Sequence, residues 1–237
     1  MVYVQGDVYL STRMDTKPLS PTKRTAIMIG IVLVIMMLFL SGLFVPKNIS
    51  LSKRLLVHEA IMWGTATFAI LYAFIAERLP LFNDEKKHDA NFYLSWILGL
   101  FVAGIGANFL ANLICGIFRI PFDAKAQHEV MILVTSNNWI MLLCAVTAGV
   151  TEEIIFRGYL LEKFHQLFND DKLAIGLSAA LFAFGHSGYH SLRTMVYTFI
   201  FGCLLGLHYR HYKSITVLIL AHAFFDLVIF LYYKNTF

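Results

Sequence analysis

Long apolar stretches separated by short polar segments dominate the pattern of this chain. A run of about 20 apolar residues is long enough to cross a lipid bilayer as an α-helix. Such spans are predicted at residues 25–45, 55–76, 92–118, 130–168, 173–190, 195–207 and 214–233. The fourth contains the polar sequence TSNN at 135–138, which predicts a break and a true span that starts nearer Trp139. The pattern therefore predicts an all-α, polytopic membrane helix bundle of about seven spans.

The same pattern predicts one membrane domain over residues 1–237, because no long linker or repeat divides the chain. Within it we expect a cytoplasmic segment at 1–24, the first three spans and their loops at 25–129, and a helical core at 130–237. A cytoplasmic N-terminus would place 12 of the 19 Lys and Arg residues on the inner side. Cytoplasmic loops carry such an excess of basic residues, so we expect a multi-pass cell-membrane protein with its N-terminus inside.

Composition excludes a water-soluble globular protein. Hydrophobic residues make up 58% of the chain and charged residues only 14%, whereas about a quarter of a soluble domain is charged. The lipid bilayer is therefore the expected surrounding. The net charge of +4 comes from scattered basic residues, and this arrangement predicts no nucleic-acid partner.

Charged and imidazole side chains inside the predicted spans fall into three groups. They are EEIIFR at 152–157, FAFGH ending at His186, and HAFFD at 222–226. A charged side chain near the bilayer centre costs roughly 2.5–3.5 kcal/mol even on insertion scales, so such residues are functional candidates.

Helix geometry separates the two adjacent glutamates. On an α-helix, Glu153 and Arg157 are four residues apart and about 40° from each other, so they can pair on one face. Glu152 lies about 140° from Arg157 and cannot share that contact. We therefore interpret Glu153 and Arg157 as a neutralised supporting pair. Glu152 is interpreted as a buried carboxylate that is available as a general base.

Spacing along the chain places the three groups at similar depths. Glu152 and His186 are each 17 residues from Asn169, in the polar turn NDDK that would join their helices. In an antiparallel hairpin the two side chains would reach the same level. Asp226 and His222 lie four residues apart on the last span, so they face one direction. We expect Glu152, His186 and His222 to converge on one cavity below the membrane surface.

The three groups, in this order, resemble the EExxxR, FxxxH and HxxxN/D motifs of the CAAX protease and bacteriocin-processing family of intramembrane proteases, also called CPBP or Abi. The resemblance covers roughly residues 130–226 and includes the small-residue pair Gly202 and Gly206. It implies an all-α bundle that cleaves a peptide bond of a membrane-associated or lipid-modified protein or peptide.

The resemblance also implies roles for the individual site residues. Glu152 would be the base and His186 would be its partner on the attacking water. His222 and Asp226 would complete the catalytic site, although other members carry Asn at the last position. A zinc site formed by Glu152, His186, His222 and Asp226 is the alternative, and it would activate the water through a metal. The metal-free mechanism is favoured, because the spacing differs from HExxH.

Two other functional classes stay open at this point. The chain could bind another membrane protein or peptide without cleaving it, as an immunity protein does. It could also relay ions or protons as a transporter, although no inverted repeat is visible in the sequence.

Overall fold

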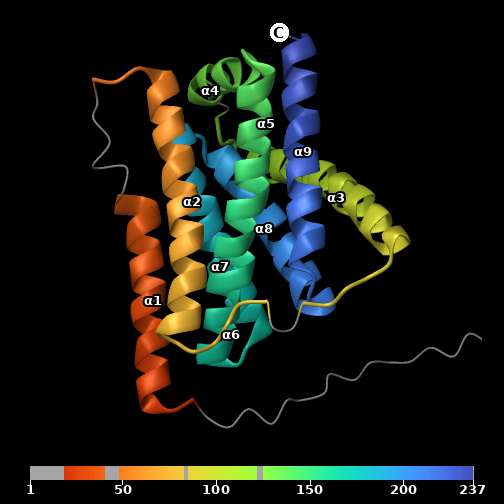
Figure 1. Ribbon diagram of the computed structural model, residues 1–237. Helices are drawn as coiled ribbons and strands as arrows, with labels where there is room; N and C mark the ends of the chain where they lie inside the picture. Colours follow the sequence, from red (N-terminus) through yellow and green to blue (C-terminus); the bar gives the residue numbers. More distant parts are fainter. Residues whose placement is uncertain (1–18, 41–47, 83–84, 122–124, 237) are drawn as a thin grey trace, which may run out of the picture.

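The structure is a computed structural model that describes residues 19–40, 48–82, 85–121 and 125–236 (Figure 1). Its elements in chain order are α1 (Pro21–Leu40), α2 (Leu51–Ile75), α3 (Ala90–Ile117), α4 (Lys125–Thr135), α5 (Asn138–Thr147), the π-helix η2 (Ala148–Leu161), α6 (Glu162–Phe168), α7 (Asp171–Gly185), the 3₁₀-helix η3 (His186–Tyr189), α8 (Leu192–Tyr212) and α9 (Ile215–Thr236). No strand occurs in these described ranges, which confirms the predicted all-α class. Most of the predicted N-terminal segment 1–24 lies outside them.

Five helical stretches in the described part of the chain are long and apolar enough to cross a membrane. They are Pro21–Leu40, Leu51–Ile75, Ala90–Ile117, Asn138–Phe168 and Ile215–Thr236. The predicted count of seven spans is not confirmed, because α7 and α8 do not meet this description. α7 has 15 residues, or about 22 Å of helix, against a hydrocarbon core of about 30 Å. α8 is longer, but polar residues occupy both of its ends.

The predicted break at TSNN is present. α4 ends at Thr135, and Asn137 caps the start of α5 by accepting a hydrogen bond from the Trp139 amide at 2.7 Å. An Asn side chain at this position satisfies an amide that the first helical turn leaves unpaired. The candidate membrane span of this segment therefore starts at α5, as the polar sequence predicted.

The turn at Asn169 produces the expected hairpin. Asn169 adopts a left-handed conformation with φ 52°, which Asn tolerates better than most residues. Asp170 then caps α7 by accepting from the amides of Lys172 and Leu173. As a result, α7 packs back against η2 and α6.

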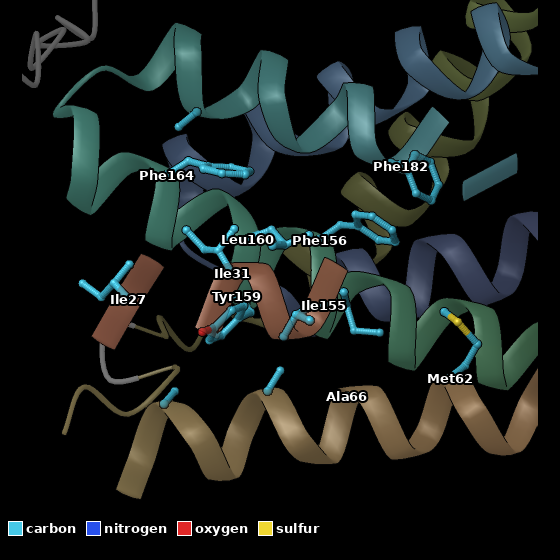
Figure 2. Close-up of a cluster of buried hydrophobic side chains, with 14 residues drawn as sticks. Ile27, Ile31, Met62, Ala66, Ile155, Phe156, Tyr159, Leu160, Phe164 and Phe182 are labelled. Carbon is cyan, nitrogen blue, oxygen red and sulfur yellow. The ribbon is translucent and has the colours of Figure 1, made fainter. Parts of the chain in front are cut away.

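The helix that carries the first motif lies in the centre of the bundle. Half of the apolar window of Asn138–Phe168 is buried, whereas a third or less is buried in the other four candidate spans. Figure 2 shows η2 side chains packed between α1 and α2 on one side and α7 on the other. The labelled members of this core are Ile27, Ile31, Met62, Ala66, Ile155, Phe156, Tyr159, Leu160, Phe164 and Phe182.

Candidate active site

The π-helix η2 carries both glutamates and Arg157. Its hydrogen bonds run from residue i to i+5, which gives more residues per turn and less rotation per residue than an α-helix. Adjacent residues such as Glu152 and Glu153 therefore project closer to one direction than an α-helix allows. Both carboxylates face α9, where their contacts with His222 lie. The sequence pattern predicted an ordinary α-helix here.

Gly149 sets the close approach of η2 to α9. A Cβ added at this glycine would lie 2.8 Å from the backbone nitrogen of Ala223 and 3.0 Å from its Cα. Any larger residue would push the two backbones apart. Because Ala223 directly follows His222, this contact holds the imidazole at the level of the two glutamates.

Glu153 links Arg157 and His222 through one oxygen. Arg157 Nη1 donates to Glu153 Oε1 at 2.6 Å, and His222 Nδ1 donates to the same oxygen at 2.7 Å. A carboxylate only accepts, so Nδ1 carries a proton and Nε2 is directed elsewhere. The Glu153 side chain is 0% exposed and the Arg157 side chain 1%. The predicted supporting pair is present, and it also orients an imidazole, which spacing alone did not indicate.

Glu152 and Asp226 lie on the other side of the His222 ring. Both carboxylates are 3.8 Å from His222 Nε2, which is too long for a hydrogen bond. Their side chains are 14% and 22% exposed, unlike Glu153. These two carboxylates are therefore the ones that a water molecule or a ligand can reach.

His186 lies at the end of α7, where the α-helix gives way to η3. Its Nδ1 donates to the Phe182 carbonyl at 2.9 Å, and Nε2 is the other polar atom of the ring. Phe182 contacts His186 edge-on at 4.8 Å between centroids, and its centroid is 6.2 Å from that of His222. The structure thus brings Glu152, His222 and Asp226 into one group and places His186 beside it, across a shared aromatic ring.

Two phenylalanines that sequence reasoning did not single out form the walls of this group. The Arg157 guanidinium lies 4.5 Å from the Phe182 ring centroid, and Phe201 meets His222 edge-on at 5.9 Å. Apolar walls exclude water from the ion pair and strengthen its electrostatic interactions. Phe182 is the first residue of the FAFGH motif, so this motif was the sequence signal that could have identified it. No motif or spacing pointed to Phe201.

Gly202 and Gly206 allow α8 to pack closely on the helices that carry the site. An added Cβ at Gly202 would meet Ala179 Cβ at 3.1 Å, and one at Gly206 would meet Ile175 at the same distance. The Gly202 carbonyl also accepts from Arg157 Nη2 at 3.5 Å. These glycines therefore position the site without contributing side chains to it.

The metal alternative concerns the same four residues. In the part of the chain that the structure describes, no three His, Cys, Asp or Glu side chains are arranged to hold a metal ion. The zinc assignment and the metal-free assignment both stay predictions, and no chemical step below depends on a metal.

Part of the chain matches a known protein family. Residues 134–228 match a family model described as "Rce1-like: Type II CAAX prenyl endopeptidase Rce1-like". This interval includes all six candidate residues: Glu152, Glu153, Arg157, His186, His222 and Asp226. The resemblance to the CAAX protease family that the three motifs predicted is thereby confirmed. No curated protein and no solved structure gives a match.

Proposed function

We propose that this chain, which is similar to the Rce1-like type II CAAX prenyl endopeptidases over residues 134–228, is an intramembrane endopeptidase. Its substrate would be a membrane-associated or lipid-modified protein or peptide, met at the lipid bilayer. Candidate membrane-crossing helices and the family match support a multi-pass membrane protein. We propose in addition that the N-terminus is cytoplasmic.

The different surroundings of the two adjacent glutamates carry this proposal. Glu153 is fully buried, and Arg157 and His222 both donate to it. Glu152 is partly exposed, and its 3.8 Å contact with His222 Nε2 is too long for a hydrogen bond. A general base needs access to water and a free acceptor, and Glu152 meets both conditions.

The proposed reaction is hydrolysis of an amide. Glu152 accepts a proton from a water molecule that His186 Nε2 also holds, and the water oxygen attacks the scissile carbonyl carbon. The carbonyl π electrons move to oxygen and form an oxyanion. When the C–N bond breaks, the electron pair goes to nitrogen, and Glu152 returns the proton to the leaving amine.

His222 is the proposed donor to the oxyanion. Glu153 holds the Nδ1 proton, so in the charged imidazolium form the second proton, on Nε2, points toward the space beside Glu152 and Asp226. A donor aimed at developing negative charge lowers the barrier. Asp226 would orient this ring, or donate a hydrogen bond itself when protonated.

A proteome comparison tests cleavage against simple binding. Cells that carry the wild-type chain should contain new peptide termini in membrane proteins, and cells with Glu152→Gln at equal expression should lack them. The exposed Glu129 supplies the matched control, because Glu129→Gln should behave as wild type. Retention of the biological effect by Glu152→Gln would contradict proteolysis and support the binding or immunity role instead. Ion flux that depends on Glu152 would support a transporter.

A further inference from the structure

A phenol beside the candidate site has no role in the proposed chemistry. The Tyr197 hydroxyl on α8 is buried, and none of the described residues gives it a hydrogen-bond partner. A buried hydroxyl without a partner is unfavourable, and most such groups in folded proteins are hydrogen-bonded. Tyr197 belongs to none of the three motifs, so the sequence pattern did not point to it.

Stacked aromatic rings connect Tyr197 to the wall of the candidate site. Its ring centroid is 5.8 Å from that of Phe201, at an interplanar angle of 8°, and 6.5 Å from that of Phe225. Phe201 in turn contacts His222 edge-on. Gly104 on α3 leaves room for this stack, because an added Cβ there would lie 2.6 Å from Phe225 Cε2 and 3.2 Å from Phe201 Cε2. The phenol is therefore packed among rings that also border the site.

Helix register places Tyr197 and Asp226 at the same level of the bundle. The connection between α8 and α9 is short, so the two helices run in opposite directions. From the contact between Phe201 and His222, Tyr197 is one helical turn back along α8 and Asp226 is one turn forward along α9. In antiparallel helices these two steps go the same way. The Asp226 charge also acts on the Tyr197 phenol, which is consistent with this level.

Asp226 is the acceptor that this geometry offers to the hydroxyl. Asp226 Oδ2 is 3.8 Å from His222 Nε2, which is too long for a hydrogen bond. A phenol that donates to a carboxylate forms a charge-assisted hydrogen bond, which is stronger than a neutral one. Joining the two groups would satisfy the buried hydroxyl and tie the carboxylate to α8.

We propose that the Tyr197 hydroxyl donates a hydrogen bond to the Asp226 carboxylate, and that Tyr197 is thereby a positioning residue of the active site. The bond holds Asp226 back from His222 Nε2. The Nε2 proton then stays available to the oxyanion and is not taken by the neighbouring carboxylate. This role rests on the proposed endopeptidase activity, and it adds a residue that none of the three motifs contains.

Thermal unfolding in detergent tests the hydrogen bond without using activity. Tyr197→Phe removes only the hydroxyl and should lower the thermal midpoint of the otherwise wild-type chain by about 2–4 °C. On the Asp226→Ala background, or on Asp226→Leu if the alanine variant does not fold, the same substitution should leave the midpoint unchanged, because the acceptor is gone. The matched control is Tyr72→Phe, since the Tyr72 hydroxyl donates to the Ala26 carbonyl at 3.1 Å. The control should lower the midpoint equally on both backgrounds.

The rate of cleavage tests the positioning role. Tyr197→Phe should lower kcat for a farnesylated fluorogenic peptide about tenfold and leave KM unchanged, because the bond acts on the oxyanion donor and not on substrate binding. Tyr72→Phe, which also removes one phenol hydroxyl, should keep the wild-type kcat.

An effect of Tyr197→Phe on the midpoint that is the same on both backgrounds, including no effect on either, would overturn the hydrogen bond. A wild-type kcat in Tyr197→Phe would overturn the positioning role. Failure of the proposed function has another signature: the wild type cleaves nothing, yet the midpoint loss from Tyr197→Phe still depends on Asp226. In that case the hydrogen bond stands and the hydrolysis does not.

Discussion

The central helical stretch formed by η2 and α6 contributes to two buried ion pairs. The two pairs differ in how their charges are balanced. Near its C-terminal end, Lys163 Nζ lies 2.7 Å from Glu77 Oε2, and Tyr159 donates to Glu77 Oε1 at 2.6 Å. About two turns earlier, Arg157 pairs with Glu153. All four charged side chains are at most 1% exposed. Burial is therefore equal in the two places and cannot by itself identify an active site.

The surroundings of the two pairs do differ. The Glu77 cluster joins one carboxylate to one ammonium and a phenol, so its charge is neutral and it is sealed. At the other pair, two further carboxylates, Glu152 and Asp226, approach His222 from a partly exposed side. A balanced, sealed cluster offers no group to a substrate, whereas accessible carboxylates beside an imidazole can exchange protons. We therefore propose a structural role for the Glu77 cluster and a catalytic role for the group around His222.

Removing Glu153 should have the largest effect, because it breaks two buried interactions at once. Glu153→Ala leaves Arg157 buried without a carboxylate, which costs about 3–5 kcal/mol, and it also releases His222. We expect a strong loss of folded protein, measured by fluorescence-detected size-exclusion chromatography, and no cleavage by the remainder. Normal folding with complete loss of activity would instead indicate that Glu153, and not Glu152, is the general base.

Substitutions in the Glu77–Lys163 cluster should lower stability without changing activity. Lys163→Met removes the ammonium group beside the Glu77 carboxylate, keeps the Tyr159 hydrogen bond, and should lower the free energy of unfolding by about 3 kcal/mol. The kcat per folded molecule should stay at the wild-type value. The double change Glu77→Gln with Lys163→Met removes both charges and should recover most of the stability. A lower kcat at normal stability would contradict the structural assignment.

Gly149 tests whether the distance between η2 and α9 controls activity. Gly149→Val places methyl groups against the Ala223 backbone, and such overpacking costs about 1–3 kcal/mol. We expect the loss in kcat/KM, expressed as a free energy, to exceed the loss in the free energy of unfolding. The reason is that His222 moves with the displaced helix. Gly106 on α3 is the matched control, since an added Cβ there meets nothing within 4 Å. Equal losses from both variants would show that helix–helix distance is not the cause.

Substitution of Asp226 by Asn should have the smallest effect on activity. In the metal-free mechanism Asp226→Asn keeps a neutral polar group beside His222, so activity should stay within about tenfold of wild type, or about 1.4 kcal/mol in the barrier. Chelators should change the rate little. Activity lost both in Asp226→Asn and on chelation would decide for a zinc site, in which an anionic ligand is needed.

The sequence predicted those parts of the fold that depend on local signals. Apolar runs located the long helices, TSNN located the break before α5, and Asn169 located the hairpin. The π-helix was missed, because a shift from i+4 to i+5 hydrogen bonds leaves the apolar composition unchanged. The Glu77–Lys163 pair was missed because its members are far apart in sequence and no spacing rule links them.

For the candidate site, the sequence proposed the residues but did not indicate most of the contacts between them. Spacing correctly paired Glu153 with Arg157, since the two are close along one helix. It did not indicate that Glu153 also holds His222, because that contact depends on the approach of η2 to α9 at Gly149. The position of His186 beside Phe182 depends on the residue at which α7 ends. The exact end of a helix is difficult to predict from sequence.

The most direct test is the kcat of Glu152→Gln for a farnesylated fluorogenic peptide, measured at equal concentrations of folded protein in detergent. Loss of the base should lower kcat by about 10²–10⁴-fold, with the thermal midpoint unchanged, because Glu152 makes no buried ion pair with Arg157. Activity within tenfold of the wild type would contradict the assignment of Glu152 as the base.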